Sequence, residues 1–535
     1  SYTFLGELTG NPLADFMLNY ASNYTETALD PFGKYRWFNL EPYIEDQVKL
    51  RKNLTLTAAL RYEFYQPEHE LHNMLGGFDS ALYNPADAPT VNPDGSIVPN
   101  TGNLLNGIIV AGHNTNAGAN SSPYGQALFP SHKHAFAPRL GLSWDPFSDG
   151  KMAIRAGYGV FYDRWGSYSQ FGAYNPPFNS SVNIFGTSLD NPGGVAGTVF
   201  PAGLNTALTP WKYPGVQKWS LNVQREVAPD TSFSLGYVGT KGTHLLGFYD
   251  MNQGQPNVNV ANGNDGPDYF RPYQGFDQIS AYATIFDSNY NALQASLIHR
   301  LKNGVSFQVS YTYSKTLTDN PGPNGTAYTS TWPQDSYNIR AEYGPADFDR
   351  TQILSFNYSW ELPFFKHANA VTKAFLGGWQ VSGITVFQSG APLTVTLPND
   401  QAGVGSYNQR PDQVGNPFQA GTIAANPTCA APSQVHTMAS WFNPCAFALN
   451  ALGTFGDERT GALRGPYFQD WDMGLAKNFA LRESVGLQFQ LEAFNVFNHP
   501  SWGQPNLTWT EGSPLGTITS ATSPRLVQLS LALKF

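Results

Sequence analysis

The chain has 535 residues, of which only 13% are charged and 14% are aromatic, and its formal net charge is −9. Soluble globular chains carry roughly 25% charged residues, and no stretch approaches the roughly 18 consecutive apolar residues that indicate a membrane-spanning helix. The acidic balance argues against nucleic acid as the main partner, and a charge-poor, aromatic-rich chain without helical spans is typical of a membrane β-barrel.

Long segments that alternate apolar and polar residues follow one another along the chain. In the segment 53–65, Leu54, Leu56 and Leu60 share one face, and polar or small residues occupy the other. Such segments reach about 10–14 residues, whereas soluble strands average about 5–6 and a tilted membrane strand needs about 9–11. We predict thirteen strands, at residues 35–49, 53–65, 134–146, 150–162, 215–228, 231–243, 279–301, 303–315, 350–362, 375–388, 467–480, 482–497 and 523–535. The segment 279–301 is long enough to extend beyond a bilayer.

The predicted connections alternate between short and long. Short ones fall at 50–52, 147–149, 229–230, 302 and 481, with a longer one at 363–374. Long ones fall at 66–133, 163–214, 244–278, 316–349, 389–466 and 498–522. Bacterial outer-membrane barrels place short turns in the periplasm and long loops outside the cell. We therefore predict an all-β fold, an antiparallel transmembrane-type β-barrel with extracellular loops in the outer membrane, over residues 35–535, preceded by an N-terminal loop segment at 1–34. A soluble sandwich or propeller explains neither the strand length nor the shortage of charge.

The last predicted strand carries alternating apolar residues and ends the chain on an aromatic. Val527, Leu529, Leu531, Leu533 and Phe535 share one face. This pattern resembles the C-terminal signal that outer-membrane barrels present to the barrel-assembly machinery, so we expect both that machinery and outer-membrane lipid as partners.

The number of strands carries a further expectation. Strand 13 ends on the short-turn side, so strand 1 of thirteen begins on the long-loop side. Single-chain bacterial barrels have an even number of strands, and lipid tolerates no open sheet edge. We therefore expect the chain to be the C-terminal part of a larger barrel, or to close its edges with another chain, including other copies of itself.

Few residues are candidates for special chemistry. We expect Cys429 and Cys445, in the loop 389–466, to form a disulfide in an oxidising compartment, since metal binding would need further ligands nearby. A closed loop of about 15 residues could stabilise that segment by roughly 3 kcal/mol.

Four charged residues fall on the polar face of the predicted strands: Arg61, Glu63, Glu226 and Glu492. They are expected to line the lumen, where they could contact a solute or a plug, although a polar lumen alone explains them. Asp347, Asp349 and Arg350 open a strand and are expected to form ion pairs at the rim.

Other candidates have a plain alternative. His132 and His134 could begin a metal site, as more weakly could His69 and His72, but a polar loop explains both pairs. The run of Asn262, Asn264, Asp265 and Asp268 falls short of a calcium-binding loop, which favours a solvated turn. The loop aromatics could capture carbohydrate or peptide, but packing within the loops is the simpler interpretation for Trp332, Tyr337, Tyr407, Trp441 and Phe442. No catalytic motif is present, so we expect neither an enzyme nor a cofactor.

Several stretches, in order along the chain, resemble the Oar-like TonB-dependent receptors of the outer membrane. They are TGNPLADF (9–16), LTLTAALRYE (54–63), ADFDR (346–350), ELPF (361–364), GWQVSGITVFQSGA (378–391), RGP (464–466), KNF (477–479) and NVFNHP (495–500). The resemblance implies a complete barrel of 22 strands and a receptor that takes up a bound substrate.

The family's plug domain, TonB-contacting segment and N-terminal regulatory-like domain are not recognisable in this sequence, so a TonB partner is expected only if a plug lies upstream. Two other functions stay open: a structural chain that assembles through its sheet edges, with other copies or a donated strand, and a passive porin.

Overall fold

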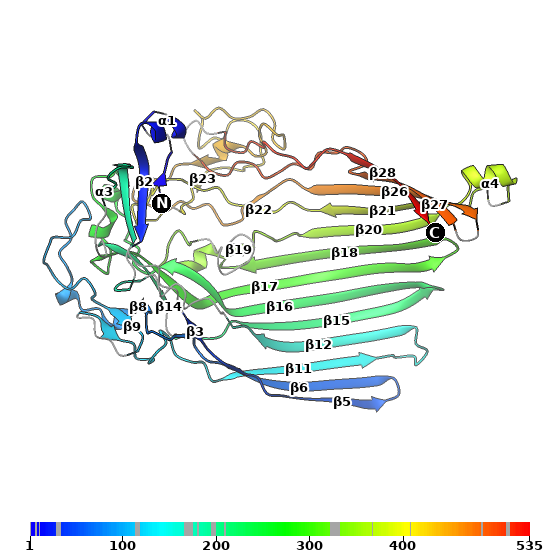
Figure 1. The fold of residues 1–535 in the computed structure, drawn as a ribbon, viewed down its shortest axis with the longest axis horizontal. Helices are drawn as coiled ribbons and strands as arrows, with labels where there is room; N and C mark the ends of the chain where they lie inside the picture. The colour runs from blue at the N-terminus through cyan, green and yellow to red at the C-terminus, as the bar shows by residue number, and fades with distance from the viewer. Residues whose placement is uncertain are drawn as a thin grey trace.

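The computed structural model describes residues 2–5, 8–9, 11–27, 34–112, 118–164, 175–178, 181–193, 200–207, 210–320, 332–365, 367–406, 408–482, 485–509 and 514–535. Thirteen long strands form one meander, in which each strand pairs antiparallel with the next long strand along the chain (Figure 1). They are β5 (Tyr43–Arg51), β6 (Leu54–Tyr65), β11 (Ala135–Trp144), β12 (Met152–Tyr162), β15 (Gly215–Ala228), β16 (Thr231–Asp250), β17 (Phe276–Lys302), β18 (Val305–Thr318), β20 (Gln352–Glu361), β21 (Trp379–Gln388), β26 (Phe468–Arg482), β27 (Val485–Phe494) and β28 (Leu526–Lys534). Each of the thirteen predicted strands overlaps one of these, but the predicted strand 35–49 is interrupted and residues 375–376 belong to the helix Ala370–Leu376.

Short elements fill the connections. The strands are β1 (Tyr2–Thr3), β2 (Tyr20–Thr27), β3 (Tyr35–Arg36), β4 (Asn39–Leu40), β7 (His69–Glu70), β8 (Gly76–Phe78), β9 (Ile108–Val110), β10 (Asn120–Ser121), β13 (Ser181–Ser188), β14 (Ala202–Ala207), β19 (Gly344–Pro345), β22 (Pro392–Leu393), β23 (Asp412–Gln413), β24 (Phe447–Ala448) and β25 (Leu463–Arg464). The helices are α1 (Pro12–Met17), α3 (Val258–Ala261) and α4 (Ala370–Leu376), with 3₁₀ turns at Ser80–Leu82, Pro85–Asp87, Pro267–Tyr269, Ile339–Glu342 and Pro444–Ala446. Helix α4 lies at the short-turn end of the sheet, whereas α1, α3, β8 and β9 lie at the opposite end, which we call the loop end (Figure 1).

One face of the sheet exposes its apolar side chains. Leu140, Leu221, Leu293 and Leu531 are 45–66% exposed on that face, and the register continues the face from strand to strand. A sandwich would bury these side chains against a second sheet, because burial of apolar surface drives folding in water. The exposed belt instead has the form of a surface in contact with lipid, and the sandwich interpretation is wrong.

The described sheet is open. Its outermost strands, β5 and β28, each pair with one neighbour among the described residues. Strand β5 runs from the loop end towards the short-turn end (Figure 1). Closure into a 22-stranded barrel stays a prediction.

The predicted strand 35–49 is interrupted in the structure. It divides into β3, β4 and β5, and β5 continues to Arg51. Pro42 lies in the break, where its carbonyl accepts a hydrogen bond from the Tyr62 amide at 3.0 Å. Proline has no N–H to donate to a ladder, so regular pairing stops beside it.

The segment 1–34, expected as an N-terminal loop, contains α1 and β2. The Asn11 side chain caps α1 by accepting from the Leu13 amide at 2.9 Å. Strand β2 pairs antiparallel with β13, which belongs to the predicted connection 163–214. This segment therefore adds to the structure at the loop end (Figure 1).

Strands β16 and β17 are 20 and 27 residues long and extend past their neighbours, as expected for 279–301. The pairing of β15 with β16 ends where Gly215 of β15 faces Thr243 of β16. The register of β16 with β17 shifts between Gly242 and Leu245. Beyond that shift the hairpin packs against the loops, and Ile279, Ala281 and Ala283 are fully buried. The loop end is therefore a packed body, which we call the loop cap.

None of the described helices is both long enough and apolar enough to cross a membrane.

Candidate ligand-binding pocket in the loop cap

Besides the buried residues of β17, an apolar core holds the loop that follows β21. Leu393, Phe442, Phe447 and Leu463 are at most 3% exposed, and Leu507 from the last long loop packs against them. The disulfide between Cys429 and Cys445 lies in the same core, with its Cα atoms 5.6 Å apart. The predicted disulfide is present, and the core fixes two long loops against each other.

A pocket of about 340 Å³ lies beside this core. Its charged lining residues are Glu342, Asp347, Arg350 and Arg410. Uncharged polar side chains also line it, namely Thr394, Thr396, Asn408, Thr460 and Gln504, together with Phe348, Pro392, Leu393 and Leu507. The segment before β20, the loop after β21 and the loop after β27 therefore meet at one pocket.

Two ion pairs connect the segment before β20 to the loop after β21. Arg410 Nη1 donates to Glu342 Oε2 at 2.5 Å, and the Thr460 hydroxyl donates to the same carboxylate at 3.0 Å. Arg464 Nη2 donates to Asp349 Oδ2 at 2.7 Å. Glu342 and Asp349 are nearly inaccessible, so these charges are neutralised inside the protein.

Asp347 and Arg350 differ from those pairs. Burial raises the pKa of the Asp347 carboxyl to about 6, and no residue in the described part of the chain forms an ion pair or hydrogen bond with it. The Arg350 guanidinium donates through Nη1 to the backbone carbonyls of Asp347 and Asp349. Burial and the nearby Arg464 lower the pKa of Arg350, and together they outweigh the opposing effect of the Asp349 carboxylate. Of the three predicted rim charges, only Asp349 forms an ion pair within the described residues.

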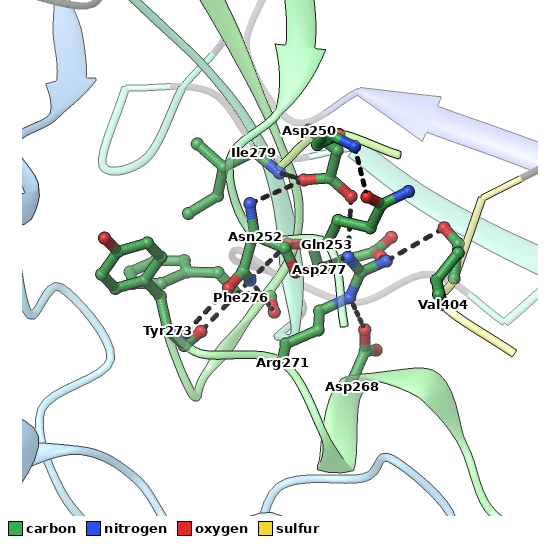
Figure 2. Close-up of polar contacts among 12 residues, drawn as sticks. Asp250, Asn252, Gln253, Asp268, Arg271, Tyr273, Phe276, Asp277, Ile279 and Val404 are labelled. Carbon is green, nitrogen blue, oxygen red and sulfur yellow. Dashed lines mark hydrogen bonds and ion pairs between the residues drawn. The ribbon is translucent and has the colours of Figure 1, made fainter. Parts of the chain in front are cut away.

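A separate cluster of charges holds the loop between β16 and β17 (Figure 2). Arg271, 3% exposed, contacts the carboxylates of Asp250 at 2.9 Å, Asp268 at 2.6 Å and Asp277 at 2.8 Å. Burial raises the pKa of Asp268 to about 6 despite the opposing Arg271 charge. Asp268 therefore forms an ion pair with Arg271, whereas Asn262 and Asn264 of the same run are exposed, as the solvated-turn interpretation predicts.

The Arg271 cluster also connects different segments of the loop cap to one another. The Asn252 amide donates to the carbonyls of Phe276 and Asp277 at 3.0 and 2.8 Å, and its oxygen accepts from the Tyr273 amide at 2.7 Å (Figure 2). Arg271 Nη2 also reaches the Gly405 carbonyl at 3.4 Å. The contacts are therefore internal, and this cluster supports the cap.

The four residues expected to line a lumen lie on the face opposite the exposed apolar side chains. Arg61 contacts Glu41 at 3.2 Å, and Glu63 accepts from the Tyr65 hydroxyl at 2.6 Å. Glu492 borders a groove of about 640 Å³, and Glu226 pairs with Ser232 in the ladder. A lumen requires closure of the sheet, so their lumenal role stays a prediction.

The remaining candidates occupy ordinary positions. The His132 and His134 rings lie 6.2 Å apart, and across the described residues no group of three or more His, Cys, Asp or Glu is placed to hold a metal. Trp441 and Phe442 are buried in the disulfide core and Trp332 packs against Phe248, whereas Tyr337 is 58% exposed. Tyr407 lies outside the described residues.

The sequence did not reveal the pocket or the Arg271 cluster. Arg271, Glu342 and Arg410 are charges in long loops, and their ion-pair partners are up to 68 residues away along the chain. The one available signal was the ADFDR stretch at 346–350, which places two carboxylates and a guanidinium at the start of a strand.

Several solved outer-membrane proteins are similar to this chain, at sequence identities of 10–11%. The outer membrane transporter YddB from Escherichia coli is 11% identical, with 94% of this chain and 54% of that one covered at a TM-score of 0.44. The FrpB iron transporter from Neisseria meningitidis is 10% identical, with 93% and 45% covered at a TM-score of 0.40. The pyoverdine receptor FpvA from Pseudomonas aeruginosa is 10% identical, with 94% and 42% covered at a TM-score of 0.39.

The chain thus spans about half the length of these solved proteins. A search of curated proteins finds no significant match. The family model described as an outer membrane beta barrel domain matches residues 1–528, nearly the whole chain. The chain therefore belongs to the outer membrane beta barrel domain family.

Proposed function

We propose that this chain is the barrel portion of a TonB-dependent outer-membrane receptor, which binds a solute at its loop cap and imports it. The observation that carries the proposal is the polarity of the sheet. An exposed apolar belt covers the described strands, and the packed loop cap with its charged pocket lies at one end of them. In outer-membrane barrels the long loops face outwards, so we place the loop cap outside the cell.

The open edges require a partner for this function. In lipid, an unpaired strand edge costs several kcal/mol for each unsatisfied backbone group. Strands β5 and β28 must therefore pair further in the membrane, either with strands of the same polypeptide or with another chain. A receptor of this type also requires a plug, and the polar face that holds Glu226 and Glu492 offers the surface that a plug would occupy.

The proposal is tested on the complete protein, purified from outer membranes in detergent. We expect it to bind the isolated periplasmic domain of TonB and to show no steady conductance in planar bilayers, because a plug blocks the lumen. Steady conductance without TonB binding would instead identify a passive porin. Large edge-paired assemblies in electron micrographs, in place of closed barrels, would support a structural role.

The placement of the loop cap has its own test. An epitope tag is inserted after Ser433, in the loop that follows β21, and in a matched variant after Asp149, in the short turn between β11 and β12. Antibody applied to intact cells should label the first variant alone. Labelling of the second variant alone would reverse the proposed orientation.

A further inference from the structure

The loop-cap pocket contains one carboxylate and one guanidinium that form no ion pair with any described residue. Asp347 and Arg350 line the same cavity of about 340 Å³. Within the described residues neither has an ion-pair partner, and they do not pair with each other, although they are three positions apart. Both side chains are partly buried, and charges withdrawn from water are normally paired, so two such charges beside one cavity indicate a ligand that carries the complementary charges.

The other charges around the pocket are already satisfied. Glu342 is paired with Arg410, and the neighbouring Asp349 is paired with Arg464. These pairs fix the segment 342–350 against the loop after β21. The charge that remains for a ligand is therefore one negative and one positive group, held on a fixed framework.

The rest of the lining is suited to a small amphipathic molecule. Phe348 is 51% exposed and lines the pocket with Leu393 and Leu507. Hydroxyl and amide groups, including Thr394 and Asn408, supply further hydrogen bonds. The volume lies near the lower end of the roughly 300–1,000 Å³ of small-molecule sites, so the occupant is no larger than one or two amino-acid residues.

From this arrangement we propose that the pocket binds a zwitterion with an apolar side chain, an amino acid or short peptide with free termini. The Asp347 carboxylate accepts from its ammonium group, and the Arg350 guanidinium donates to its carboxylate. The inference rests on the proposed function in that it names the class of solute that the receptor captures.

The experiment measures calorimetric binding of L-leucyl-L-leucine and L-leucine to the complete protein in detergent. The matched ligands are N-acetyl-L-leucyl-L-leucine, which lacks the cation, and L-leucyl-L-leucinamide, which lacks the anion. We expect each to bind roughly tenfold or more weakly than the dipeptide, because each loses a charge-assisted hydrogen bond. Binding by L-leucine as strong as by the dipeptide would assign the free amino acid within the proposed class.

Two variants assign the contacts. In Asp347→Asn the preference for the free amine over the acetylated ligand should disappear, whereas the preference for carboxylate over amide should stay. Arg350→Gln should show the reverse. Asp149→Asn and Arg51→Gln, at the short-turn end, should keep both preferences. Heat-modifiable migration in gels verifies that each variant is folded.

The pH dependence gives an independent readout. The ligand's ammonium group stays protonated up to a pH of roughly 7.7, whereas Asp347 ionises near a pKa of about 6. The other charged groups of the pocket are Glu342, Arg350 and Arg410. Dipeptide affinity should therefore rise from pH 5 to pH 7 in the wild type and be flat in Asp347→Asn.

Absence of dipeptide and leucine binding, or binding that ignores both substitutions, would overturn the inference. Binding that meets these expectations in a protein that does not contact TonB would overturn the proposed transport and leave the pocket assignment intact. TonB contact without zwitterion binding would do the opposite.

Discussion

Arg464 Nη2 lies 2.7 Å from Asp349 Oδ2, and this ion pair joins residues 115 positions apart. The second oxygen of Asp349 accepts from the Thr316 amide at 2.7 Å. One buried carboxylate therefore connects the end of β18, the segment before β20 and the segment before β26. These three segments leave the sheet at the loop end, and Asp349 lies between two residues that line the pocket, Phe348 and Arg350.

Replacing Arg464 should weaken the contact between these three segments. In Arg464→Gln, Asp349 loses its cation while it stays buried, which should destabilise the loop cap by roughly 1–3 kcal/mol, since the Arg464 side chain is one-third exposed. Hydrogen exchange of the amides in 342–351 measures the effect. Arg459→Gln, an exposed arginine of the same loop, serves as the control, and equal exchange in both variants would contradict the expectation.

The exposed apolar belt predicts a difference between the two faces of one strand. In β15, Leu221 is 50% exposed on the apolar face, and Ser220 lies on the opposite face. Leu221→Arg should cost roughly 2–4 kcal/mol near the middle of the bilayer, whereas Ser220→Arg should be tolerated. Refolding yield into lipid vesicles compares them, and equal yields would contradict the membrane assignment of this face.

Loss of Arg271 should release the loop between β16 and β17. Arg271→Ala would leave three neighbouring carboxylates without their cation, at a cost of roughly 3–5 kcal/mol. Arg271→Lys keeps the charge but lacks the planar fork, so it should rescue the loop only in part. Limited proteolysis within 251–275 reports the change, and an unaltered cleavage rate in Arg271→Ala would refute the supporting role.

The raised pKa of Glu458 should make the stability of the loop cap depend on pH. Burial raises its pKa to about 8, although its carboxylate accepts from the Val395 amide at 3.0 Å. Because the folded pKa lies above the unfolded value, folding favours the protonated form, and stability falls as the pH rises from about 4.5 to about 8.

Glu458→Gln keeps an oxygen for the Val395 amide and removes the ionisation. At pH 7 it should stabilise the loop cap by roughly 3 kcal/mol. Protease resistance of the loop after β21, measured from pH 5 to pH 9, should decline in the wild type and stay level in the variant. A parallel decline in both would exclude Glu458 as the cause.

Removal of the disulfide should act on the pocket through the core beside it. The bond between Cys429 and Cys445 closes a loop with a sequence separation of 16, so the paired change to Ser should cost roughly 3 kcal/mol. The core includes Leu393, which also lines the pocket. We expect faster proteolysis of 421–446 and weaker dipeptide binding, and treatment of the wild type with a reductant should reproduce both effects.

The long strands were predictable because alternation is local. Each strand shows its two faces within a few residues, and Leu54, Leu56 and Leu60 already mark the side that the folded sheet exposes. The sequence does not predict the interruption at Pro42, because the flanking residues alternate well enough to suggest a continuous strand. One missing N–H is a weak signal in a pattern of hydrophobicity, although it decides the pairing.

The pocket could not be predicted, because it depends on contacts between residues that are far apart in the sequence. Its charges come from loops, and the pairing of Arg410 with Glu342 or of Arg464 with Asp349 depends on how several loops pack together. Rim ion pairs were expected for Asp347, Asp349 and Arg350 together, yet only Asp349 is paired within the described residues. Asp349 is buried and paired with Arg464, whereas Asp347 and Arg350 line the cavity.

In the proposed receptor, the length of β17 sets how far from the lipid a solute is first bound. At about 3.3 Å per residue, the 27 residues of β17 extend for roughly 90 Å, whereas a hydrocarbon layer is about 30 Å thick. Even if β17 is steeply tilted, much of its length therefore extends beyond the bilayer. Under the proposed function, solute capture therefore takes place in the aqueous space, and the captured molecule would then move along the polar face of the sheet to reach the membrane.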